Sequence, residues 1–251
     1  MKITFLGTGV GIPQIGRVQS GLIMEMDGTP VLFDCGCGVL VRIVEAGYEH
    51  TDIGNIVLTH LHLDHVGDVL ALLKANWLMG KTDMRIFGPQ GTQEWFGKVM
   101  ETYDYLKGNF EVEITELAGG ETFTFQGIDC NITCTPTIHS TTSLAYRVEC
   151  GGKSVVYTGD TEPSESVFEF ARNADIMIHE CSFPVNFEMT NHTTPDMFIE
   201  MLEQTQLHVK RLFFTHLYPH MKGHEKETLD HINQYFEGKV TIASDLMEIE
   251  V

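Results

Sequence analysis

Positive charge is scarce in this sequence. Its 251 residues include 16 Lys and Arg against 35 Asp and Glu, which gives a formal net charge of −19. A charge of this sign repels polyanions at long range unless bound cations reverse the field locally. We therefore expect large nucleic acids to be disfavoured as partners.

Long apolar segments and cysteine frameworks are also lacking. No run approaches the roughly 20 apolar residues of a membrane-spanning helix, and the opening MKITFLGTGVG breaks at glycines, unlike a signal peptide. We expect no membrane partner and a cytoplasmic location. The cysteines have neither zinc-ribbon spacing nor the density of a disulfide scaffold, which predicts reduced thiols in a reducing compartment. They are Cys35, Cys37, Cys130, Cys134, Cys150 and Cys181.

Hydrophobic patterning predicts two similar halves, each with strands followed by helices. Strands are expected over residues 2–7, 20–28, 30–36, 121–136, 144–160 and 174–181. Helices are expected over residues 38–48, 66–80, 193–207 and 226–236. This order predicts an α/β fold in which sheet packs on sheet with helices outside, a four-layer αββα sandwich. We expect a single domain over residues 1–251, because the 43% hydrophobic content suits one substantial core.

The segment THLHLDHVGD, residues 59–68, concentrates metal-binding side chains directly after an apolar run. His60 and His62 alternate, so both can point the same way from extended backbone. Asp64 and His65 follow at the turn into a helix, where they can serve a second position. Zinc accepts imidazole nitrogen and carboxylate oxygen, and catalytic sites keep a position open for water. A polar loop whose histidines are merely solvated is the alternative, and the density of this motif disfavours it.

Further ligand-type residues stand at the ends of other strand patterns. His139 follows NITCTPTI, Asp160 closes SVVYTGD, and His216 closes RLFFTH. Each alone is weak evidence, because a histidine at a strand end is more often a hydrogen-bonded structural residue. Together with the 59–68 segment they supply five histidines and two aspartates.

The order of these motifs resembles the metallo-β-lactamase superfamily, and within it the ribonuclease Z-like hydrolases. The resemblance runs essentially end to end. Its motifs are FLGTGVGIPQIGRVQS, LFDCG, THLHLDHVGD, RIFGPQG, TGDT, IHECSF, NHTT, FFTH and ASDLMEI. A glutamate replaces the second histidine in the iron-dependent oxidoreductases of the superfamily, whereas His62 occupies that position here, which favours hydrolysis.

The resemblance implies a dinuclear site that holds two zinc ions, with manganese or iron as alternatives. One ion would be bound by His60, His62 and His139, the other by Asp64, His65 and His216, with Asp160 bridging. Two cations about 3.5–4 Å apart would make hydroxide available near neutral pH and stabilise a pentacovalent phosphoryl transition state.

Four residues have roles that the sequence leaves open or gives only by resemblance. Asp34 either orients a ligand histidine or closes a turn after its strand. Asp64 would be catalytic as well as a ligand, by orienting the attacking water or by accepting its proton. His192 in NHTT would protonate the leaving alkoxide, unless it merely precedes a helix that Thr193 or Thr194 caps. Glu180 either orients a site histidine or is an ordinary strand-end carboxylate.

The expected substrate is a small phosphodiester, such as a cyclic nucleotide or a short nucleotide diester. Family members that process tRNA carry an arm between the third ligand histidine and the bridging aspartate, and here a hairpin around Gly151-Gly152 fills that interval. The alternatives are ribonuclease Z activity, hydrolysis of lactones, sulfate esters or thioesters, and a metal-binding module without catalysis. The resemblance also implies a homodimer.

Overall fold

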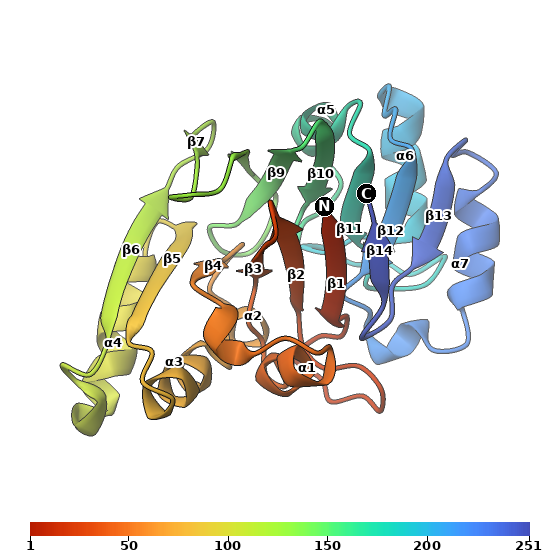
Figure 1. Cartoon of the computed structure of the whole chain (residues 1–251). Coiled ribbons are helices and arrows are strands. Elements are labelled where there is room, and N and C mark those ends of the chain that lie inside the picture. The colour runs from red at the N-terminus through yellow and green to blue at the C-terminus, as the bar shows by residue number, and fades with distance from the viewer.

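Two seven-stranded sheets pack face to face in the computed structural model, which describes residues 1–251 (Figure 1). The first sheet has the order β14 (Glu248–Glu250), β1 (Lys2–Gly7), β2 (Gly21–Met26), β3 (Thr29–Phe33), β4 (Asn55–Val57), β5 (Asp83–Pro89) and β6 (Glu111–Leu117). The second has the order β13 (Lys239–Ile242), β12 (Arg211–Thr215), β11 (Ile176–Glu180), β10 (Lys153–Tyr157), β9 (Leu144–Cys150), β8 (Cys130–Pro136) and β7 (Thr122–Phe123).

Helices cover the outer face of each sheet. The first sheet is flanked by α1 (Val39–Glu45), α2 (Leu63–Val66), α3 (Val69–Leu78) and α4 (Thr92–Thr102). The second is flanked by α5 (Glu165–Ala171), α6 (Pro195–Gln204) and α7 (Glu225–Ile232). The predicted four-layer αββα sandwich is therefore confirmed. None of these helices is both long and apolar enough to cross a bilayer.

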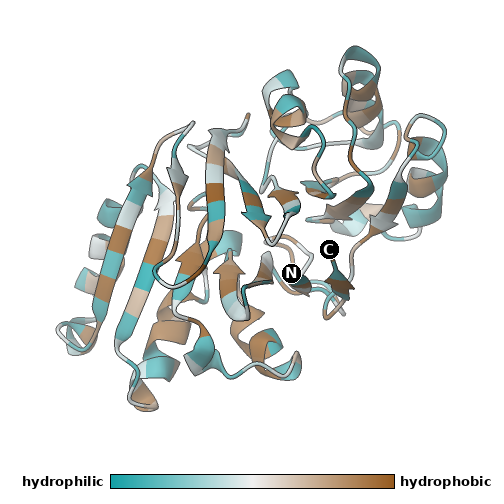
Figure 2. Ribbon diagram, turned by 45° about the horizontal axis from the view of Figure 1, so that its top comes forward, coloured by the Kyte–Doolittle hydropathy of each residue, from teal (hydrophilic) through white to brown (hydrophobic).

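Side chains alternate between the two faces of each strand, so each sheet packs against the other sheet on one face and against helices on the other. In β2, Leu22 and Met24 point into the core between the sheets, whereas Ile23 packs with the helices. Phe5 of β1 meets Phe213 of β12 across the core with ring centroids 5.7 Å apart. The ribbon coloured by hydropathy shows apolar bands crossing the strands of both sheets (Figure 2). Because side chains on the two faces of a strand alternate, one apolar strand contributes to two layers.

Parallel strands place their carboxyl ends along one edge of the sandwich. In the first sheet, β3, β4, β5 and β6 run parallel. In the second, β10, β11, β12 and β13 do so. Residues that follow these strands therefore meet at the same edge, which is where open α/β sheets bind ligands.

Three expectations from the sequence require correction. The strand expected over 121–136 is interrupted, and leaves β7 and β8 at its two ends. The helix expected over 66–80 starts later, as α3 at Val69, because the backbone N–H of Asp68 donates to the Cys35 carbonyl oxygen (2.9 Å) and not to the preceding turn α2. Cys130 and Cys150 form a disulfide instead of remaining thiols, since they lie directly opposite each other on β8 and β9.

The hairpin predicted around Gly151-Gly152 is confirmed. It joins the antiparallel strands β9 and β10, and the two glycines have φ angles of 58° and 73°. These left-handed values suit glycine and a tight two-residue turn. The chain between His139 and Asp160 therefore consists of the two strands, this turn and the short connections 140–143 and 158–159.

Candidate active site

The loops at the carboxyl edge bring together all seven residues predicted to bind metal. Extended backbone after β4 places His60 and His62, and α2 begins one residue later and places Asp64 and His65. The other three follow strands of the second sheet, namely His139 after β8, Asp160 after β10 and His216 after β12. The first sheet thus supplies four of these side chains and the second supplies three.

Short distances connect the candidate ligand atoms. Asp160 is central: its Oδ1 lies 3.2 Å from His65 Nε2, and its Oδ2 lies 3.3 Å from His216 Nε2 and 3.7 Å from His60 Nε2. On one side of it, His139 Nε2 lies 3.1 Å from His62 Nδ1. On the other side, His216 Nε2 lies 3.5 Å from Asp64 Oδ2. Two overlapping groups of ligand atoms result, with Asp160 between them.

Several of these atoms are buried without a hydrogen-bond partner. They are His60 Nε2, His65 Nε2, His216 Nε2 and Asp160 Oδ1. Leaving a buried polar atom without a partner costs about 1–3 kcal/mol. A divalent cation is the ligand that this donor set fits, since neutral imidazole nitrogens and carboxylate oxygens bind zinc, manganese and iron. The cluster is therefore able to bind metal.

The Nδ1 atoms of three candidate ligand histidines are held by neighbours outside the cluster. The Nδ1–H of His65 donates to Asp34 Oδ2 (2.8 Å), and Nδ1 of His60 lies 3.0 Å from Thr59 Oγ1. In the same way, Nδ1 of His139 lies 2.9 Å from the carbonyl oxygen of Asn191. An acceptor at Nδ1 fixes the tautomer that leaves Nε2 free for a metal and also fixes the orientation of the ring.

Of the two roles that the sequence left open for Asp34, the structure favours the orientation of a candidate ligand histidine. Asp34 is fully buried after β3, and its Oδ2 accepts hydrogen bonds from His65 Nδ1–H (2.8 Å) and from the Tyr157 hydroxyl (2.8 Å). Its Oδ1 accepts from the backbone N–H of Thr59 (2.8 Å), which follows β4 and not the strand of Asp34. The carboxylate therefore links the ends of two strands and does not close a local turn.

Glu180 orients His192, at the edge of the cluster. Its Oε1 accepts a hydrogen bond from His192 Nδ1 at 3.0 Å. The fully buried carboxylate also accepts from the backbone N–H groups of Thr161 (2.8 Å) and Thr193 (3.1 Å). Helix α6 is capped by Thr194, whose hydroxyl accepts from Met197 N at 3.3 Å. Because His192 takes no part in that cap, its side chain is left for the site.

Ser182 was not recognised from the sequence. Its hydroxyl donates to Glu180 Oε2 (2.6 Å) and lies 3.1 Å from His216 Nδ1. One hydroxyl therefore links the carboxylate that holds His192 to a candidate metal ligand. A serine one position after IHEC carries no signal of this role in the sequence, because the contact with His216 spans two strands.

Asp245, in the ASDLMEI motif, was also not recognised as part of the site. Its carboxylate accepts hydrogen bonds from Thr8 N (3.0 Å), Thr8 Oγ1 (2.7 Å) and Val18 N (2.7 Å). These contacts hold both ends of the glycine-rich loop after β1. Within that loop, Gly11 N–H donates to Asp64 Oδ2 at 3.0 Å. The end of the chain thus supports the position of Asp64 through the first loop.

Electrostatics keep both candidate carboxylate ligands ionised. Burial by itself raises the pKa of Asp64 and Asp160, but His216 and His65 outweigh it and lower the pKa of both groups below the ordinary range. Burial lowers the pKa of His60 well below its usual value, so that this imidazole is neutral. For His65, burial lowers the pKa, but Asp160 and Asp34 raise it overall. A bound cation would take the place of the proton that these carboxylates favour on His65.

Comparison with known proteins identifies the family. The model described as Beta-lactamase superfamily domain matches residues 29–217. The chain belongs to this superfamily. With its cluster of histidines and aspartates able to bind metal, this β-lactamase superfamily protein is a metal-dependent hydrolase.

Relatives and solved structures resemble this superfamily member over its whole length. A ribonuclease Z of Methanosarcina acetivorans is 28% identical over 305 aligned positions, which include 100% of this chain and 98% of the relative. The metallo-beta-lactamase fold protein YhfI from Bacillus subtilis has a TM-score of 0.85 at 25% identity, with 99% of this chain and 98% of that chain covered. The short form of human tRNase Z shares the fold, with a TM-score of 0.80, 23% identity, and coverage of 100% and 99%.

These relatives overturn one expectation from the sequence. Large nucleic acids were expected to be disfavoured as partners, yet full-length relatives are named ribonuclease Z. The expectation was wrong because it rested on a net charge of −19 for the whole chain. Net charge averages over the entire surface, whereas binding depends on the local field, to which bound metal ions contribute the largest charges.

Replacing Asp34 by alanine should weaken metal binding without abolishing it. The substitution removes the acceptor at Nδ1 of His65, and such partners typically account for about 10–100-fold in metal affinity. Competition with a chromogenic chelator measures the affinity of the purified variant for Zn²⁺. Tyr146→Phe is the control, because the Tyr146 hydroxyl donates to the Leu58 carbonyl in the same core without touching a site residue. Equal Zn²⁺ affinities for Asp34→Ala and the wild type would contradict the orienting role.

Proposed function

We propose that this protein hydrolyses phosphodiester bonds with two divalent metal ions. The main support is the position of His192 beside the cluster: its ring centroid lies 5.4 Å from those of His139 and His216. A structural metal site closes its coordination shell and needs no proton donor at its edge. Cleavage of a phosphodiester with an alkoxide leaving group does need one.

The proposed ligands divide into two sets. One ion would be held by His60, His62 and His139, the other by Asp64, His65 and His216, and Asp160 would bridge them. Zinc fits both sets, and manganese or iron are alternatives with the same donor types. When bound, two such ions lower the pKa of a water molecule and stabilise charge on the phosphoryl oxygens.

His192 is proposed to donate a proton to the leaving oxygen from Nε2. Its Nδ1 is engaged by Glu180, so Nε2 is the nitrogen available to substrate. Burial by itself lowers the pKa of His192, but the hydrogen-bonded Glu180 carboxylate outweighs burial and raises it. The imidazolium form therefore persists to a higher pH than in a free histidine, as a general acid requires.

Asp64 is proposed to orient the attacking water as well as to bind metal. Its carboxylate is ionised and is held by Gly11 N–H and by the facing His216. An ionised carboxylate in a fixed orientation can accept a hydrogen bond from water and direct its lone pair at phosphorus.

A second candidate function is the endonucleolytic processing of tRNA. The support is the ribonuclease Z of Methanosarcina acetivorans, which aligns with 100% of this chain. That alignment has 305 positions against the 251 residues here, so the relative contains segments without a counterpart. The experiment below therefore includes a precursor tRNA beside small substrates.

Hydrolysis of a panel of substrates tests the proposal. The panel contains bis(p-nitrophenyl) phosphate, a 2′,3′-cyclic nucleotide, a lactone, a sulfate ester, a thioester and a precursor tRNA. We expect Zn²⁺- or Mn²⁺-dependent turnover of the phosphodiesters, and Asp160→Ala prepared identically controls for contaminating hydrolases. More efficient turnover of the lactone, sulfate ester or thioester than of any phosphodiester would refute the proposal. Cleavage of precursor tRNA at least as efficient as that of the small diesters would establish the second function.

Metal analysis should find close to two transition-metal ions per chain. The expectation rests on seven ligand-type side chains whose donor atoms form overlapping groups around Asp160. Elemental analysis after gentle dialysis and after incubation with Zn²⁺ measures the content. Removal of metal by a chelator should abolish turnover, and Zn²⁺ should restore it. A content near zero with no uptake on addition of metal would exclude a dinuclear centre.

Replacement of His192 by alanine should slow the enzyme according to the leaving group. For an alkyl leaving group, which needs protonation, we expect a loss of about 10²–10⁴-fold in turnover. For p-nitrophenolate, a good leaving group, the loss should be less than about tenfold. His192→Ala should keep its metal, whereas Asp64→Ala should lose metal. Equal losses on both leaving groups would show that His192 is not the proton donor.

A further inference from the structure

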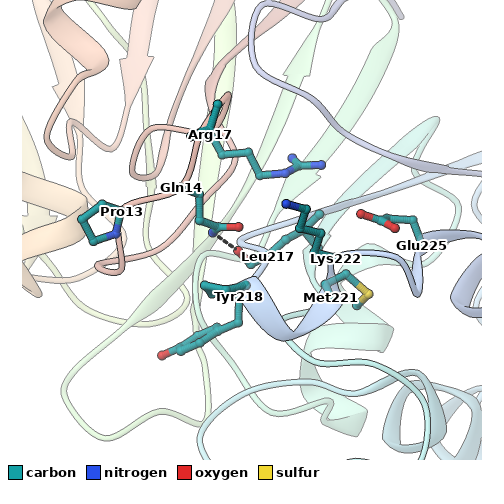
Figure 3. Close-up of a pocket in the computed structure, with 10 residues that line it drawn as sticks. Pro13, Gln14, Arg17, Leu217, Tyr218, Met221, Lys222 and Glu225 are labelled. Atoms are coloured by element: carbon teal, nitrogen blue, oxygen red, sulfur yellow. Dashed lines mark hydrogen bonds between the residues drawn. The ribbon is translucent and has the colours of Figure 1, made fainter.

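A cavity of about 430 Å³ lies between the loop after β1 and the segment after His216 (Figure 3). Its volume falls in the range of small-molecule binding sites. One wall is formed by Pro13, Gln14, Ile15 and Arg17, and the other by Leu217, Tyr218, Pro219, Met221, Lys222 and Glu225. The two walls are tied together, since Gln14 Nε2 donates to the Leu217 carbonyl oxygen at 2.7 Å. The cavity is therefore a built feature of these two loops.

Two cationic side chains, Arg17 and Lys222, line this cavity outside any salt bridge, although the charges of Asp245 and Glu225 act on the Arg17 guanidinium. Arg17 donates from Nη1 to Thr8 Oγ1 and to the Ala243 carbonyl oxygen (2.7 Å), so its guanidinium is held in place, but its other nitrogens bind no protein group. Lys222 is exposed and its ammonium makes no hydrogen bond or ion pair. In Figure 3 the ends of both side chains approach the same space.

One acidic residue offsets part of this charge. The Glu225 carboxylate also lines the cavity and accepts a hydrogen bond from Gly223 N–H at 2.7 Å. The lining keeps a net positive charge, although the chain as a whole carries −19. Most other lysines and arginines on this surface lie in ion pairs, as Lys226 does with Asp230. A fixed guanidinium and a free ammonium suit a phosphate group.

Tyr218 joins the cavity to the candidate active site. It lines the cavity, and its hydroxyl lies 3.5 Å from His192 Nε2, the nitrogen proposed to protonate the leaving oxygen. Its ring stacks on Phe183 with centroids 4.4 Å apart, which fixes its position. In Figure 3 the Tyr218 hydroxyl points away from the ends of Arg17 and Lys222, so a leaving group that receives its proton at His192 is separated from the cationic end of the cavity by the Tyr218 side chain.

We propose that this cavity is a subsite for a phosphate group on the leaving-group side of the substrate. The preferred substrate would then carry two phosphates, a scissile diester at the metal cluster and a second phosphate held by Arg17 and Lys222. A nucleotide with a terminal phosphate or the adjacent nucleotide of an RNA strand presents this chemistry. The inference rests on the proposed function, because it assigns the cavity to the leaving group.

Calorimetric titration of the full-length protein in excess Zn²⁺ tests the subsite by binding alone. The probes are adenosine 3′,5′-bisphosphate and AMP, which differ by one phosphate. We expect the bisphosphate to bind at least about tenfold more tightly, since a charge-assisted contact adds affinity of this order. Lys222→Glu should abolish this difference. Lys226→Glu is the matched control, because it makes the same charge change on a neighbouring exposed lysine that faces away from the cavity.

Three results would overturn the subsite: equal affinities of the wild type for the two probes, a Lys222→Glu variant that keeps the difference, or a Lys226→Glu variant that loses it equally. Displacement of the bisphosphate by a short oligoribonucleotide distinguishes an RNA strand from a free nucleotide as the source of the phosphate. Failure of the proposed function would appear separately, as absence of metal-dependent diester hydrolysis.

Discussion

Five imidazole rings and two carboxylates lie within one small volume, and the rest of the structure has to hold them there. Unpartnered nitrogens and oxygens that point at one another are unstable in a dry interior unless a cation lies among them. The fold brings these atoms together by ending its strands at one edge. Hydrogen bonds to the far side of several of these rings then fix the direction of the free lone pairs, as Asp34 does for His65 and Thr59 does for His60.

One carboxylate connects the candidate metal cluster with the candidate proton donor. Glu180 accepts a hydrogen bond from His192 and another from the Ser182 hydroxyl, which in turn contacts His216. A change in charge at His216 would therefore reach His192 through three short contacts. Such networks behave as a unit, because each hydrogen bond polarises the next. Their residues are best separated by double substitutions, since single changes disturb both partners.

Much of the fold and site could be predicted from the sequence, because local chemistry determines them. The alternation of apolar residues identified strands, and the dense 59–68 segment identified metal-binding side chains without knowledge of their partners. His139, Asp160 and His216, predicted at the ends of β8, β10 and β12, lie beside this segment because parallel strands end at the same edge of a sheet. The role proposed for His192 came from resemblance to a family, because its position in the sequence left that role open.

The remaining features depend on contacts between distant parts of the chain. Ser182 and Asp245 act across strands and loops, and nothing beside them in the sequence marks these contacts. The late start of the helix expected over 66–80 follows from Asp68, whose backbone N–H bonds to Cys35 in a distant loop. The pairing of Cys130 with Cys150 follows from the register of β8 and β9, which cysteine spacing does not encode.

The cluster draws its side chains from both sheets, and this has a thermodynamic consequence for the whole chain. Neither half alone contains a complete set of ligands, because Asp160 of the second sheet stands between histidines of the first. Ions that bind only the assembled site stabilise the native state by mass action and act as cross-links between the two layers. Local opening of either sheet would then release metal before the chain unfolds globally. The rate at which a chelator captures the ions becomes a measure of how often the sandwich opens.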